Sequence, residues 1–112
     1  MGVMGGFLPA RELFTSISAK DAGSNVVVQG SGGLRIRVVK YTLSPGGPVV
    51  VTWESSKAGA ISGPMPISPE GGGLDSGYCP AGLMQTAFGE DLTLNLSSAV
   101  SVGGMLTYVL TP

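Results

Sequence analysis

Apolar and polar residues alternate along several short stretches of the chain, which is the pattern of β-strands with one buried face. The clearest stretch is Asp91–Ser97, where three leucines alternate with Thr93, Asn95 and Ser97. Glycine, proline and short polar residues separate the stretches, as the turns of a many-stranded β-protein require. The sequence therefore predicts an all-β fold of about eight strands, a β-sandwich or a jelly roll.

Residues 34–55 contain two β-branched runs joined by Pro45-Gly46-Gly47-Pro48. This connection predicts a β-hairpin, in which Pro45 sets the first corner and Gly46 takes the positive φ of a type II turn. The alternation in the first run changes phase between Val38 and Val39, which predicts either a β-bulge or a strand buried on both faces. In the second run, Trp53 is the largest predicted core side chain, and its buried N–H needs a hydrogen-bond partner.

The remaining predicted strands are shorter or less regular: Phe14–Ser18, Asn25–Gln29, Ala60–Ser62, Leu74–Tyr78, Leu83–Ala87 and Met105–Leu110. Three prolines in residues 63–69 predict a segment at a sheet edge or crossing between sheets. The final strand is apolar on nearly both sides, so we expect a central sheet position or a subunit contact. Residues 1–12 do not alternate, and we expect an extended N-terminal arm before a single domain over residues 13–112.

Composition limits the classes of partner. The chain has 112 residues, enough for one core without disulfides or metals. Charged residues make up 12% and the net charge is −1, so the composition does not favour binding to nucleic acid. A weakly charged surface is typical of an oligomer or of a subunit of a larger assembly. No apolar run is long enough to cross a membrane and the N-terminus lacks a signal peptide's basic start, so we expect no membrane partner and synthesis in the cytoplasm.

The available chemistry does not favour catalysis. The chain has no histidine and one cysteine, Cys79, so the commonest general base and a thiolate metal site are both missing. The candidate carboxylates lie at predicted strand ends or in turns: Glu54, Glu70, Asp75, Glu90 and Asp91. Glu90-Asp91 is interpreted first as a turn, with a weak Ca²⁺ contact and catalysis as alternatives. We expect a protein that is not an enzyme and uses no cofactor.

Six residues are candidates for protein interfaces: Phe7, Leu8, Arg35, Arg37, Leu106 and Tyr108. Phe7 and Leu8 are the bulky pair of the arm and could anchor it in a neighbour. Arg35 and Arg37 share one strand face, which would suit an acidic partner or simply face solvent. Leu106 and Tyr108 belong to the final strand, whose apolar residues on both sides suit a contact between subunits.

Seven blocks of the sequence resemble a family of small bacteriophage and prophage structural proteins. They are Arg37–Leu43, Val49–Ser55, Ser62–Met65, Gly71–Leu74, Pro80–Leu83, Thr86–Ser97 and Val100–Tyr108, about two-thirds of the chain. The resemblance implies a virion component, a capsid decoration or cement protein assembled in the host cytoplasm. It implies a homo-oligomer, most often a trimer, that binds the outer lattice of the major capsid protein and carries no catalytic residues.

One alternative comes from a different class, a tail or fibre module that binds a host surface glycan or protein. Such a module is expected to display aromatic residues, or Asn and Asp, at its loop tips. Only Tyr78 and Phe88 fall in predicted loops.

Overall fold

The computed structural model describes residues 11–112, and within them the chain is nearly all β. Its strands are β1 (Leu13–Ala19), β2 (Gly23–Val28), β3 (Arg35–Pro45), β4 (Val49–Ser55), β5 (Gly59–Ala60), β6 (Met65–Ile67), β7 (Leu74–Asp75), β8 (Met84–Gln85), β9 (Leu92–Leu96) and β10 (Val102–Thr111). One 3₁₀ turn, η2 (Pro69–Gly71), lies between β6 and β7. In this part of the chain no helix is long and apolar enough to span a membrane.

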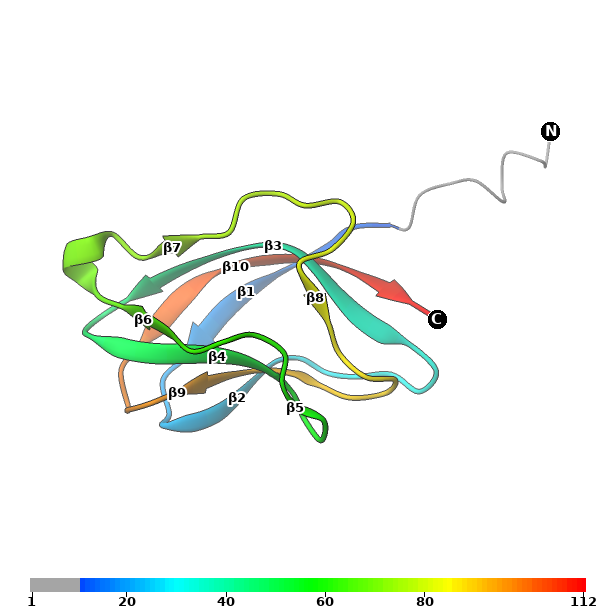
Figure 1. The fold of residues 1–112 in the computed structure, drawn as a ribbon, viewed down its shortest axis with the longest axis horizontal. Coiled ribbons are helices and arrows are strands. Elements are labelled where there is room, and N and C mark those ends of the chain that lie inside the picture. The colour runs from blue at the N-terminus through cyan, green and yellow to red at the C-terminus, as the bar shows by residue number, and fades with distance from the viewer. Residues whose placement is uncertain (1–10) are drawn as a thin grey trace.

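Two antiparallel five-stranded sheets face each other (Figure 1). Sheet A has the order β1-β10-β3, with β7 and β8 both paired to the far side of β3, and sheet B has the order β2-β9-β4, with β5 and β6 both paired to β4. The pairing is nested, since the first strand pairs with the last and the second with the ninth. A chain wound in this way from one long antiparallel ribbon is a jelly roll. The all-β sandwich predicted from the sequence is confirmed.

The core lies between the inner faces of the two sheets and is built by the predicted alternation. On β4, Val49, Val51 and Trp53 point inward, and on β9 the three leucines do so. Trp53 is completely buried, and its ring meets that of Tyr41 from the opposite sheet edge to face, with centroids 5.2 Å apart. The Trp53 indole N–H has no hydrogen-bond partner among residues 11–112. The predicted core residue is therefore correct, but its predicted polar contact is not formed.

The predicted hairpin in residues 34–55 is wrong. β3 belongs to sheet A and β4 to sheet B, so the two strands do not pair and the segment between them crosses from one sheet to the other. Gly46 does not adopt a positive φ, and its N–H donates to the carbonyl of Ser101 at 2.7 Å. The sequence shows two adjacent strands, but each pairs with a strand from the last third of the chain, β10 for β3 and β9 for β4, and that pairing decides the topology.

The predicted β-bulge near Val38–Val39 is present. Along β3 and β10 the pairing goes from Lys40 opposite Thr107 to Val38 opposite Tyr108, so that Val39 has no residue opposite it. This extra residue explains the change of phase in the apolar pattern. One inserted residue turns all the following side chains to the other face of the strand.

β10 occupies the predicted central position, between β1 and β3. It is not buried on both faces along its length, because Met105 on its outer side is 61% exposed while Val109 on the same side is buried.

The Pro-rich segment 63–69 lies at a sheet edge, as predicted. It supplies β6, which pairs with β4 at an edge of sheet B.

Two successive glycines in β10 differ sharply in the space around them. A Cβ built on Gly104 would lie 1.9 Å from the backbone oxygen of Thr42 on β3, whereas a Cβ on Gly103 would meet nothing closer than 3.7 Å. Backbone on a paired strand cannot move aside without disturbing the ladder. Gly104 is therefore required by close approach of the two strands, and Gly103 is not.

We predict that Gly104→Ala lowers the free energy of unfolding by about 2–4 kcal/mol, because the new methyl group forces β3 and β10 apart. Gly103→Ala is the matched control and should change it by less than about 1 kcal/mol. Denaturant unfolding of the two variants and the wild type measures both values. Equal effects of the two substitutions would contradict the close approach.

Candidate binding surface

The outer face of sheet A carries two large apolar side chains in the open. Phe14 on β1 is 68% exposed and Met105 on β10 is 61% exposed. They are diagonal neighbours, because Met105 lies opposite Ser16 and Phe14 lies opposite Thr107, and such pairs are within reach of long side chains. Small residues surround them on the same face. We call this surface the open face, defined by Phe14, Ser16, Ser18, Thr42, Gly103, Met105 and Thr107.

The loop between β7 and β8 covers the other end of the same sheet. It runs beside β3, where Ser76 N–H donates to Tyr41 O at 3.0 Å and Cys79 N–H donates to Val39 O at 2.9 Å. The Tyr78 hydroxyl donates to the carboxylate of Glu12, just before β1 on the far side of the sheet, so its side chain crosses the outer face. This cover accounts for the burial of Val39 and Val109, which lie outside the core cluster. Within residues 11–112, no loop covers the open face.

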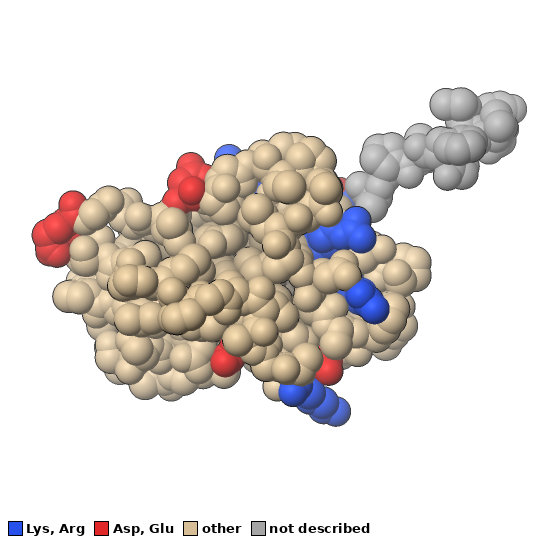
Figure 2. Space-filling view, viewed as in Figure 1, with Lys and Arg blue, Asp and Glu red and all other residues tan. Residues whose placement is uncertain are grey.

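Charged groups are sparse on the molecule. Figure 2 shows isolated acidic and basic side chains separated by large uncharged areas. Near the open face, exposed Lys40 lies opposite Thr107 and exposed Asp75 lies opposite Thr42. One charge of each sign at the border leaves an uncharged centre, which suits contact with another protein surface better than contact with a polyanion.

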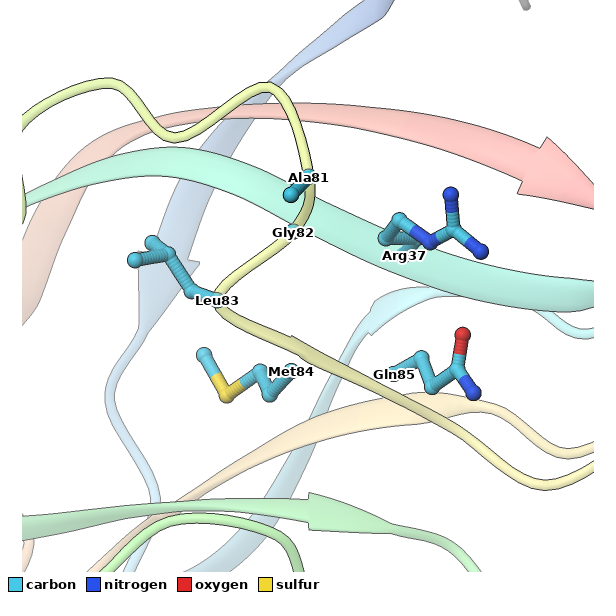
Figure 3. A pocket seen from close by; sticks show the side chains of 6 residues that line it. All are labelled: Arg37, Ala81, Gly82, Leu83, Met84 and Gln85. Carbon is cyan, nitrogen blue, oxygen red and sulfur yellow. The ribbon is translucent and has the colours of Figure 1, made fainter.

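Arg35 and Arg37 lie on the outer side of β3, as predicted, and both are half-buried. The Arg35 guanidinium lies 4.1 Å from the centre of the Phe88 ring, a cation–π contact. Arg37 is paired with Gln85 on β8, and the two side chains border an open pocket of about 290 Å³ with the backbone at Gly82 (Figure 3). Arg35 is therefore already in contact with the loop that follows β8, and the pocket beside Arg37 gathers one cation and no carboxylate.

The other four predicted interface residues have different outcomes. Phe7 and Leu8 lie outside the described residues. Leu106 is 1% exposed and points into the core, so the prediction that it contacts another subunit is wrong. The final strand has apolar residues on both sides, and the sequence did not show which side faces the other sheet. Tyr108 is half-buried and packs against the same core.

The sequence contained a pattern for the open face that did not enter the prediction. In Leu13–Ala19, Phe14 falls in step with Ser16 and Ser18, the polar side of the strand. One exposed aromatic residue is ordinary by itself, and it indicates a contact surface only when another apolar side chain lies beside it. Met105 has the same position in β10, but only the register of β1 against β10 brings the two residues together.

The acidic turn at Glu90-Asp91 joins three segments of the chain. The Glu90 carboxylate accepts hydrogen bonds from the Ser55 hydroxyl at 2.7 Å and from the N–H groups of Lys57 and Ala58, both at 2.8 Å. Asp91 accepts from Gly30 N–H at 2.7 Å. The interpretation as a turn is confirmed, and its carboxylates are occupied by backbone and hydroxyl donors.

These contacts lower the pKa of Glu90 below its ordinary value, the Ser55 hydroxyl first and the N–H groups of Ala58 and Lys57 next. Within residues 11–112, no three acidic or cysteine side chains come close enough to hold a metal ion. A second open pocket, of about 390 Å³ between β4 and β6, is lined mainly by proline and valine. The described residues therefore offer surfaces for contact and no cluster of reactive groups.

Comparisons of the chain with protein-family models, with curated proteins and with solved structures give no match.

We predict that Glu90→Gln reduces the loss of stability on acidification. Because the pKa of Glu90 is lower in the folded state, its contribution is present at neutral pH and is lost as the pH falls below the ordinary value of 4.5. Unfolding free energies measured from about pH 7 to about pH 3 should fall less in the variant than in the wild type, and the two curves should converge at the acid end. Glu70→Gln, at an exposed site in η2, is the control, and parallel curves for Glu90→Gln and wild type would refute the assignment.

Proposed function

We propose that this chain is a structural binding protein without catalytic activity, a capsid decoration protein that stabilises a phage shell by clamping non-covalently onto the lattice of the major capsid protein. The observation that carries the proposal is the open face, where exposed Phe14 and Met105 stand together among small residues. Neighbouring exposed apolar side chains on the outer side of a sheet are a candidate surface for contact with another protein.

Three further features support this function. The jelly roll is common among viral capsid and lectin domains. The low content of charged residues, 12%, suits a surface that becomes covered. The seven sequence blocks between Arg37 and Tyr108 resemble those of phage structural proteins, and this resemblance suggests the virion as the setting.

A tail or fibre module that binds a host glycan or protein is the second candidate. It is favoured by Tyr78 and Phe88, which are 54% and 52% exposed in loops. Both rings, however, already have internal partners, since the Tyr78 hydroxyl donates to Glu12 and the Phe88 ring faces Arg35. Phe14 and Met105 have no comparable polar or cationic contact in residues 11–112, so the open face is the better candidate.

We predict that Phe14→Ser combined with Met105→Ser weakens binding to shells at least about tenfold, because two buried apolar anchors would be lost from the interface. The assay adds purified protein to capsid shells that lack it and measures the bound fraction by co-sedimentation. Phe88→Ser is the matched control, the same chemical change at a similarly exposed loop ring, and should bind within about twofold of wild type.

Loss of shell binding in Phe88→Ser but not in the double variant would instead favour the loop surface of the second candidate. Absence of shell binding by the wild-type protein would overturn the decoration function.

A further inference from the structure

Three of the four sheet edges in residues 11–112 are protected against pairing with another chain. β2 is broken by a register shift between Val26 and Val28. β5 has two residues, and β6 has three, with Pro66 in the middle. β7 and β8 have two residues each. Short strands, prolines and bulges are the devices by which proteins prevent unwanted edge pairing.

The fourth edge, β1, has none of these devices. Leu13–Ala19 is seven residues long, its register with β10 is unbroken, and it contains no charged residue and no proline. No strand of the described chain pairs with its other side. An uncharged, regular edge of this length is a template for an additional strand.

The backbone groups of Ser16 point toward this vacant side. The N–H of Met105 is directed to β3, where the Thr42 hydroxyl accepts it at 3.3 Å. In antiparallel strands the N–H and C=O of one residue point to the same side. Ser16 lies opposite Met105, so its own N–H and C=O point away from β10, and by alternation those of Phe14 and Ser18 do the same.

The charges on either side of β1 match when the strand is paired with a copy of itself. Arg11 and Glu12 precede the strand, and Lys20 and Asp21 follow it. Ser16 is its central residue, and antiparallel pairing about Ser16 places Glu12 of one copy opposite Lys20 of the other. It also brings Arg11 to the same end as Asp21. Shifting the centre to Thr15 or Ile17 loses both matches.

We propose that two copies of this chain pair through β1, antiparallel and centred on Ser16, to form a two-fold dimer with one continuous sheet. The contact is self-complementary, as two-fold symmetry requires. It also joins the two open faces, so that the pair presents two Phe14 and two Met105 side chains on one surface. A three-fold ring would need two different complementary patches on each copy, and the described chain offers a single unprotected edge.

The dimer is independent of the proposed function, because it can be measured without any shell. We expect the full chain to have twice its mass of 11.2 kDa in light scattering coupled to size exclusion. Ser16→Pro removes an N–H that no strand within residues 11–112 uses, and proline is compatible with an edge strand. It should raise the dimer dissociation constant about tenfold or more, whereas Ser16→Thr, which keeps the N–H, should leave the mass unchanged.

A charge exchange tests the same pairing without altering the backbone. Glu12→Lys places like charges opposite each other at both ends of the dimer and should weaken it, and adding Lys20→Glu should restore the wild-type dissociation constant to within about threefold. Restored dimerisation cannot come from the hydrogen bond between Tyr78 and Glu12, because Glu12 is replaced in both the single and the double variant. A monomer or a trimer for the wild-type protein, an undiminished dimer for folded Ser16→Pro, or absence of rescue in the charge exchange would each overturn the proposal.

Discussion

The contact between Trp53 and Tyr41 is the packing constraint on which the rest of the sandwich depends. The indole comes from sheet B and the phenol ring from sheet A, and they meet edge to face in the middle of the core. Burying one indole contributes on the order of 5 kcal/mol. The Tyr41 hydroxyl also donates to the sulfur of Met65 in β6 at 3.5 Å, so that this one side chain from sheet A contacts two strands of sheet B. Burial raises the pKa of Tyr41, and the phenol stays neutral over the physiological range.

Once the inner faces are filled, the outer surfaces decide what the molecule can contact. The outer side of sheet B mixes polar side chains, among them Glu54, whose carboxylate accepts a hydrogen bond from Ser24 at 2.7 Å, with the two exposed valines Val26 and Val50. On sheet A, the loop that carries Tyr78 covers one end, and no other segment of residues 11–112 covers the open face at the other end. The same strand that supplies Phe14 to the open face also forms the unprotected edge. Contact with a shell and contact with a second copy would therefore use adjacent sides of β1 without competing for the same atoms.

Local patterns in the sequence predicted the structural features that depend on residues close together in the chain. Alternation predicted the strands, their inward residues and Trp53, and the phase slip at Val38–Val39 predicted the bulge. The pairing of β3 and β4 was predicted wrongly, because the choice between a hairpin and a crossing between sheets depends on strands far away in the chain. For the same reason Leu106 was assigned to the surface, and the neighbourhood of Phe14 and Met105 could not be foreseen without the register of β1 against β10.

The central claim is that this chain coats a shell, and copy number tests it most directly. The proposed function places this chain in phage particles, and quantitative mass spectrometry of such purified particles gives the ratio of this protein to the major capsid protein. We expect a ratio near one to one or a simple fraction of it, as binding at repeated lattice positions requires. A few copies to a few dozen per particle would place the protein in the tail or a fibre, and its absence from particles would contradict the account.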